Sequence, residues 1–185
     1  MRRLQPNIPI MKCLLLMLSV LVPARAATLE RMSLDEVIDK STAILRGRVA
    51  GSYVAQHGQV IYTHYTIAVS ERMKGAADSQ ADVVVAGGTI GRKTQTFPGS
   101  PALANGQEYV LCLWKSKSGL THVMGLSQGL FDVRTDAASG EVTISRGAAE
   151  SVMLDGATGL PVMDRPVRMR LRDFSARVSS APTRN

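Results

Sequence analysis

The stretch ILRGRVAGSYVAQHGQVIYTHYTIAV, residues 44–69, decides the fold because it places two β-rich runs around one turn signal. Val, Ile, Tyr and Thr are frequent in both runs, 44–54 and 60–69, and Gly58 between them can adopt the positive φ of a tight turn. The sequence therefore predicts a long β-hairpin. Alternate residues of a strand share a face, and the more apolar face of the second run is expected in the core. Its members are Ile61, Tyr65, Ile67 and Val69.

A short amphipathic helix is predicted before this hairpin. Ser33 and Glu36 have the spacing of a capping box, in which the serine side chain accepts from the Glu36 amide and the glutamate accepts from the Ser33 amide. The helix is expected to end at about Ser41. Its apolar face comprises Leu34, Val37 and Ile38.

Further strands are predicted after the hairpin, bounded by glycine and proline turn signals. Gly47 is expected to permit a bend that a closed barrel requires. Residues 142–144 are predicted as an edge strand, and residues 171–178 as a closing helix beside a basic face. One helix followed by many strands indicates a mainly β protein with a small barrel. The remaining strand segments are residues 82–85, 89–97, 109–114, 120–124 and 129–133.

Residues 11–26, MKCLLLMLSVLVPARA, have the pattern of an export signal. Lys12 precedes about ten apolar residues, whereas a helix that spans a bilayer needs about 20. Ala24-Arg25-Ala26 then offers small side chains to a signal peptidase. Cleavage near Ala26 would leave a secreted or periplasmic protein without a transmembrane segment. The four basic residues of the leader would leave with it, which lowers the formal charge from +7 to +3. A low positive charge in an exported protein makes nucleic acid an unfavourable partner.

The chain after the leader is long enough for one domain with an extension. Residues 27–145 are predicted to form the β-barrel domain. Residues 146–185 are predicted to form a loop, a short basic helix and a disordered tail that begins at Ser179. Cys112 is the single cysteine of the mature chain and lies in an apolar run. This context favours a buried thiol over an intermolecular disulfide or a nucleophile.

Several short segments between residues 33 and 135 together suggest a family. They are Ser33-Leu34-Asp35-Glu36, Ala43 to Val49, Met73-Lys74-Gly75, Val83-Val84-Val85 before Gly87-Gly88, and Gly106 to Leu111. This arrangement resembles a group of exported bacterial proteins of unknown function and, more distantly, the netrin-like module of tissue inhibitors of metalloproteinases. The resemblance implies a small OB-like barrel, and it hints at secreted peptidases as partners. Those inhibitors use an N-terminal cysteine, whereas the predicted mature chain begins at Ala27, so their mechanism does not carry over.

The leading hypothesis is a non-enzymatic β-barrel module that needs no cofactor and binds an extracytoplasmic protein or an envelope polymer. A secreted peptidase is among the protein candidates. The polar stretch 91–97 joins strands where OB-type barrels commonly present binding surfaces. The predicted contacts are Arg92, Lys93, Gln95 and Phe97.

Two alternatives stay open. Residues 125–129 match the Gly-x-Ser-x-Gly spacing of a nucleophile elbow, which would make Ser127 the nucleophile of a small hydrolase with His122 or His64 as its base. Both flanks look like strands, which favours a bulge over an elbow. The second alternative is a structural envelope protein attached through its arginine-rich end, residues 165–185. The histidines lie in a turn and two strands, without the spacing of a metal site.

Overall fold

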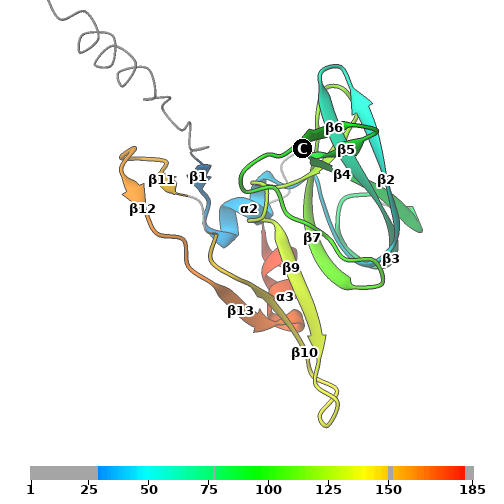
Figure 1. Cartoon of the computed structure of the whole chain (residues 1–185). Coiled ribbons are helices and arrows are strands. Elements are labelled where there is room, and N and C mark those ends of the chain that lie inside the picture. Colours follow the sequence, from blue (N-terminus) through cyan, green and yellow to red (C-terminus); the bar gives the residue numbers. More distant parts are fainter. Residues whose placement is uncertain (1–28, 77, 150–151, 182–185) are drawn as a thin grey trace, which may run out of the picture.

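The computed structural model describes residues 29–76, 78–149 and 152–181, which form a mainly β structure with two helices (Figure 1). The predicted leader, residues 1–26, lies outside the described residues. The helices are α2 (Leu34–Lys40) and α3 (Leu171–Ser180). The strands are β1 (Leu29–Arg31), β2 (Ala43–His57), β3 (Val60–Lys74), β4 (Gln80–Ala86), β5 (Gly88–Ile90), β6 (Lys93–Gln95), β7 (Glu108–Lys115), β8 (Thr121–Val123), β9 (Leu130–Thr135), β10 (Val142–Arg146), β11 (Met153–Asp155), β12 (Pro161–Val162) and β13 (Val167–Arg170).

Helix α2 begins with the capping box that the sequence predicts. The Ser33 hydroxyl accepts from the Glu36 amide at 3.2 Å, and the Glu36 carboxylate accepts from the Ser33 amide at 2.7 Å. The Ser33 amide and the Ser33 hydroxyl, which both donate to the Glu36 carboxylate, hold the pKa of Glu36 below its ordinary value. Val37 and Ile38 are buried on the inner side of the helix, as expected.

Strands β2 and β3 form the long antiparallel hairpin predicted from residues 44–69, and they extend beyond it at both ends. Gly58 stands in the turn with φ +61°. The pairing of the two strands shifts its register at Gly47, where an added Cβ would lie 2.5 Å from the Ile67 side chain. Only glycine permits that close approach without displacing β3. The bend predicted at this glycine is therefore present as a β-bulge.

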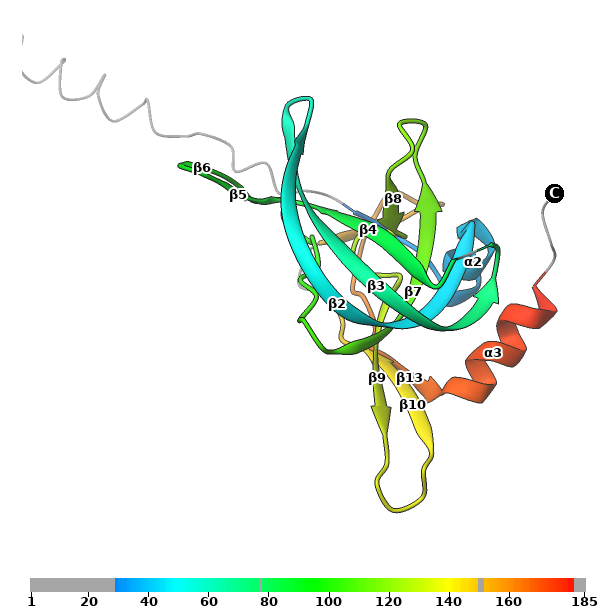
Figure 2. The same cartoon turned by 90° about the vertical axis from the view of Figure 1, so that its right-hand side faces the viewer.

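The main sheet has eight strands in the order β13-β10-β9-β7-β2-β3-β4-β8. Strand β8 pairs with β4 in parallel and also with β7 in antiparallel fashion, so the strands β7, β2, β3, β4 and β8 curve into a partial ring. The tips of the β2–β3 and β7–β8 hairpins project from the same end of this ring (Figure 2). Strands β9, β10 and β13 continue the sheet away from the ring.

Two apolar clusters lie on opposite faces of β7. Tyr109, Leu111 and Leu113 pack inside the ring with residues of β2, β3 and β4. Val110 and Cys112 point the other way, toward the two helices and β9–β10. A strand that is buried on both faces explains the continuous apolar run seen in its sequence. The core positions predicted on β3 are confirmed. Ile61, Tyr65 and Ile67 are buried, and Val69 is partly buried against the cluster inside the ring.

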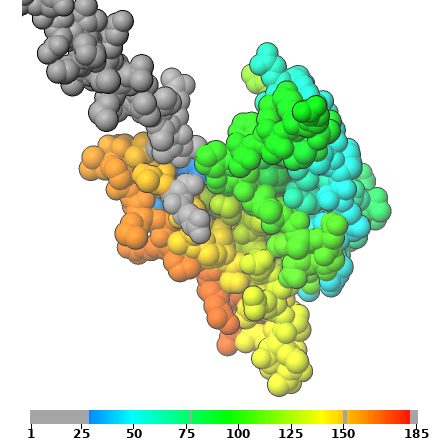
Figure 3. Space-filling view, in the orientation of Figure 1, coloured from blue at the N-terminus to red at the C-terminus, as the bar shows by residue number. Residues whose placement is uncertain are grey.

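The C-terminal part of the chain joins the same core through α3. Leu171, Phe174 and Val178 are buried on one face of the helix, as predicted, and Phe174 packs on Phe131 with ring centroids 5.6 Å apart. Strand β11 pairs in parallel with β1 at the start of the described chain. The orange C-terminal strands and the cyan β2–β3 hairpin lie on opposite sides of the molecule (Figure 3).

Three local predictions are wrong. Residues 142–144 are not an edge strand, because β10 pairs with β9 on one side and with β13 on the other. Residues 89–97 are not one extended segment beyond the glycines but fold back on themselves as the β5–β6 hairpin. Ser179 and Ser180 belong to α3 instead of a tail, because the helix runs two residues further than the apolar pattern indicated.

Candidate functional site

One row of cross-strand neighbours runs over the outer face of the partial ring. Tyr53 of β2 lies opposite His64 of β3, His64 opposite Val84 of β4, Val84 opposite His122 of β8, and His122 opposite Trp114 of β7. Residues that lie directly opposite each other point to the same face of a sheet. These five residues, called the belt below, therefore form a continuous strip outside the ring.

The belt is mostly aromatic, and its rings are in contact. Tyr53 stacks on His64 with centroids 4.5 Å apart, and Trp114 stacks on His122 at 4.9 Å. Tyr62, in the next row of β3, meets His122 edge-on at 5.8 Å. Burial lowers the pKa of His122, which favours a neutral imidazole between its aromatic neighbours.

Exposure differs sharply along the belt. Val84 and His64 are 1% and 3% exposed, so the middle of the strip is closed to solvent. Tyr53 and Trp114 at its two ends are 54% and 38% exposed. Large exposed aromatic side chains are uncommon on a surface without a partner, and they are enriched where one binds.

His64 is held by three polar neighbours. Its Nδ1 lies 2.9 Å from the Asp82 carboxylate and 3.0 Å from the Tyr53 hydroxyl. Its Nε2 lies 3.2 Å from Nε2 of His57, which comes from the exposed end of β2. All three histidines of the chain thus gather at this end of the ring. Among the described residues, no group of three or more His, Cys, Asp or Glu side chains is placed to hold a metal ion.

The four predicted contact residues lie on or beside the β5–β6 hairpin. Arg92 and Lys93 are exposed at its turn and Phe97 is 37% exposed after it. Gln95 is instead bound within the chain: its side-chain amide accepts a hydrogen bond from the Ile61 N–H at 2.7 Å and donates one to the Gln59 carbonyl at 2.9 Å. The hairpin is thereby fastened to the β2–β3 tip. The structure brings the four residues together, with three of them directed to solvent.

Ser127 lies in the turn between β8 and β9. The residues with positive φ in this turn are Gly125 and Leu126, at +57° and +58°, and not the serine that would be strained in a nucleophile elbow. The polar contacts of His64 are those named above, and His122 contacts aromatic rings, so within the described chain neither is hydrogen-bonded to Ser127. The neighbouring Gln128 is 1% exposed and anchors β1, because its side chain bonds the backbone of Glu30 and Met32.

Cys112 is fully buried in the cluster beside the helices, and burial raises the pKa of its thiol to about 12. A thiol with so high a pKa is a poor nucleophile at neutral pH. Its position agrees with the structural role expected from the apolar run.

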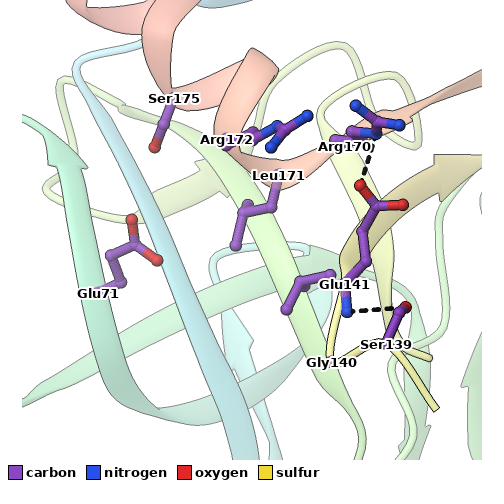
Figure 4. Close-up of a pocket in the computed structure, with 9 residues that line it drawn as sticks. Glu71, Ser139, Gly140, Glu141, Arg170, Leu171, Arg172 and Ser175 are labelled. Carbon is purple, nitrogen blue, oxygen red and sulfur yellow. Dashed lines mark hydrogen bonds and ion pairs between the residues drawn. The ribbon is translucent and has the colours of Figure 1, made fainter. Parts of the chain in front are cut away.

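A hollow in the described surface lies away from the belt, between α3, the β9–β10 turn and β3 (Figure 4). Its volume is about 780 Å³, and Glu71, Glu141, Arg170 and Arg172 give it a mixed charge. Glu141 and Arg170 form an ion pair across one side. On the same helix Arg177 donates to Asp35 of α2, so part of the predicted basic face is neutralised by contacts within the chain.

Neither described helix is long and apolar enough to cross a membrane. Comparison with protein-family models, curated proteins and solved structures finds no match to the chain.

Proposed function

We propose that the chain is an exported, non-enzymatic β module of the OB-like, netrin-like type that binds an extracytoplasmic protein or polymer through the belt and the β5–β6 hairpin. The observation that carries the proposal is the unbroken row from Tyr53 to Trp114, because it places exposed aromatic rings at both ends of a rigid strip. Aromatic side chains supply much of the contact energy at binding surfaces, since each buries a large area with little loss of side-chain entropy.

The strand order supports the OB-like part of the proposal. Five strands in the order β7-β2-β3-β4-β8, with β8 parallel to β4 and returning to β7, have the connectivity of a five-stranded, partly open barrel. In such barrels ligands commonly lie on the outer face between two hairpin tips. The belt occupies the corresponding place here, between the β2–β3 tip and the β7–β8 tip.

The export part of the proposal depends on residues 11–26 and their small-x-small end. The basic β5–β6 hairpin contacts Val54, Ile61 and Thr63, on the face of β2–β3 opposite the belt. It suits a partner with acidic groups, because Arg92 and Lys93 are exposed and form no ion pair within the described chain. Both an acidic envelope polymer and an acidic protein surface meet that requirement.

The test is retention of the purified protein on isolated cell-envelope polymer and, in a second arm, capture of proteins from the extracellular extract. Trp114→Ala and the double change Arg92→Ala with Lys93→Ala should each reduce retention at least tenfold in the arm that contains the partner. Tyr53→Phe, which keeps the ring, should retain binding, whereas Tyr53→Ala should not.

The control is Met163→Ala, an exposed apolar position, 86% exposed, in the C-terminal part of the chain. Circular dichroism checks that each variant folds. Undiminished retention by the Trp114 and Arg92/Lys93 variants, in both arms, would exclude this surface as the binding site.

A further inference from the structure

The two histidines near the β2–β3 tip face each other through the same ring atom. His57 Nε2 and His64 Nε2 are 3.2 Å apart, and their ring centroids are 5.3 Å apart. Tyr53, Ala55 and His57 alternate onto one face of β2, and the small Ala55 leaves room for His57 to lean back over β3 onto His64. The register of the β2–β3 hairpin therefore determines the short distance between His57 and His64.

Asp82 fixes the hydrogen of neutral His64. A carboxylate can only accept, so the 2.9 Å contact between its oxygen and His64 Nδ1 requires the hydrogen on Nδ1. The lone pair of His64 is then on Nε2, the atom that faces His57. Histidines that bind a metal through one ring nitrogen usually donate the N–H of the other ring nitrogen to a carboxylate, as His64 does to Asp82.

We propose that His57 and His64 are a two-imidazole binding site for a late first-row divalent cation such as Zn²⁺ or Cu²⁺, with Asp82 as the positioning residue. Two imidazole nitrogens on one tetrahedral ion, at about 2.0–2.1 Å each, are about 3.3–3.4 Å apart. The observed 3.2 Å is close to that separation. In the metal-free chain His57 donates its Nε2 hydrogen to His64; when the cation binds Nε2, His57 takes the tautomer with its hydrogen on Nδ1, so no net proton is lost.

Access and ligand type narrow the choice of cation. His57 is exposed, and the side chain of Asp82 is 51% exposed, so water can fill the remaining coordination positions. Imidazole ligands suit Zn²⁺ and Cu²⁺, whereas Mg²⁺ and Ca²⁺ prefer oxygen. The third histidine lies outside the site, because the Tyr62 ring contacts both His57, at 5.9 Å, and His122, at 5.8 Å, and stands between them.

The site goes beyond the proposed partner binding and can be tested without any partner. Isothermal titration of the purified full chain, carrying no histidine tag, with Zn²⁺ alone and with Cu²⁺ alone should give one equivalent of tight binding for each, and Mg²⁺ should give none. His57→Ala should lower the affinity at least tenfold. This variant is expected to fold because its side chain is exposed. Asp82→Asn should lower it about 10- to 100-fold.

The matched control is His122→Ala, which removes a histidine from the same face while keeping the pair. It should bind the metal as the unchanged protein does. In ¹⁵N spectra of the imidazoles, Zn²⁺ should shift Nε2 of His57 and of His64 and leave the Nδ1–H of His64 in place. Equal affinity in the His57→Ala variant, equal loss in the His122→Ala variant, or no binding at millimolar Zn²⁺ and Cu²⁺ would each overturn the proposal.

Discussion

Truncation of Phe174 to alanine should destabilise the whole described fold. The Phe174 side chain is fully buried in α3 and packs on Phe131 of β9. Loss of its transfer free energy costs about 2 kcal/mol. A residual cavity of about 80 Å³ adds about 2 kcal/mol at about 24 cal/mol per Å³. We therefore expect Phe174→Ala to lower the free energy of unfolding by about 4 kcal/mol.

The assay is urea unfolding followed by fluorescence of Trp114, the single tryptophan of the chain. Trp114 lies in the belt, on the face of β7 that also carries Val110 and Cys112, but outside the cluster that holds Phe174. Its unfolding midpoint therefore shifts in Phe174→Ala only if the two parts unfold together. The denaturation midpoint should fall while the dependence on urea stays the same. Phe97→Ala is the matched control, because the same change at a side chain 37% exposed should cost less than about 1 kcal/mol. An unchanged Trp114 midpoint in Phe174→Ala, or an equal loss in Phe97→Ala, would refute the reasoning.

Three further predictions concern buried polar groups. Gln128→Leu should cost about 1–3 kcal/mol in urea unfolding, because it leaves two backbone groups of the β1 segment without their partner. Burial alone would raise the pKa of Asp164, but hydrogen bonds from Arg146 and a backbone amide outweigh it and lower the pKa. The stability that this contact provides is therefore present above the ordinary aspartate pKa of about 3.9, and it is lost as the pH falls through the lower pKa of Asp164 in the folded protein. Asp164→Asn should flatten that part of the pH dependence of the free energy of unfolding. Cys112, with its pKa raised to about 12, should resist alkylation by iodoacetamide at pH 8 until urea unfolds the chain, and rapid labelling of the folded protein would contradict its burial.

Local signals in the sequence predict local structure well. The Ser33–Glu36 box fixes the start of α2, and Gly58 fixes the turn of the β2–β3 hairpin, because each depends on residues only a few positions apart. The apolar spacing of 171–178 likewise predicts the buried face of α3. Sequence patterns are less informative where a partner is distant. Strand β10 has an edge-like composition, yet β13, about 25 residues further on, covers its free side.

The belt is a non-local feature, which is why the sequence did not reveal it. Alternation places Tyr62 and His64 on the face of β3 away from the core, and that signal is readable in the sequence. Their meeting with Trp114 and His122 depends on β8, a strand of three residues that pairs with two neighbours. The pairing of His57 with His64 depends on the register of the hairpin, which the turn at Gly58 sets, because pairing is regular from His57–Val60 to Gly51–Thr66.

The parallel pairing of β1 with β11 has a consequence for the order in which the chain can fold. Leu29 is opposite Met153, a separation of more than 120 residues, and α2 shares its apolar cluster with α3. Contacts so remote along the polypeptide form late, since the intervening segment must first be ordered. In a nascent chain β7 and β9 can cover only part of the inner side of α2, so this side is fully covered only after α3 has been synthesised.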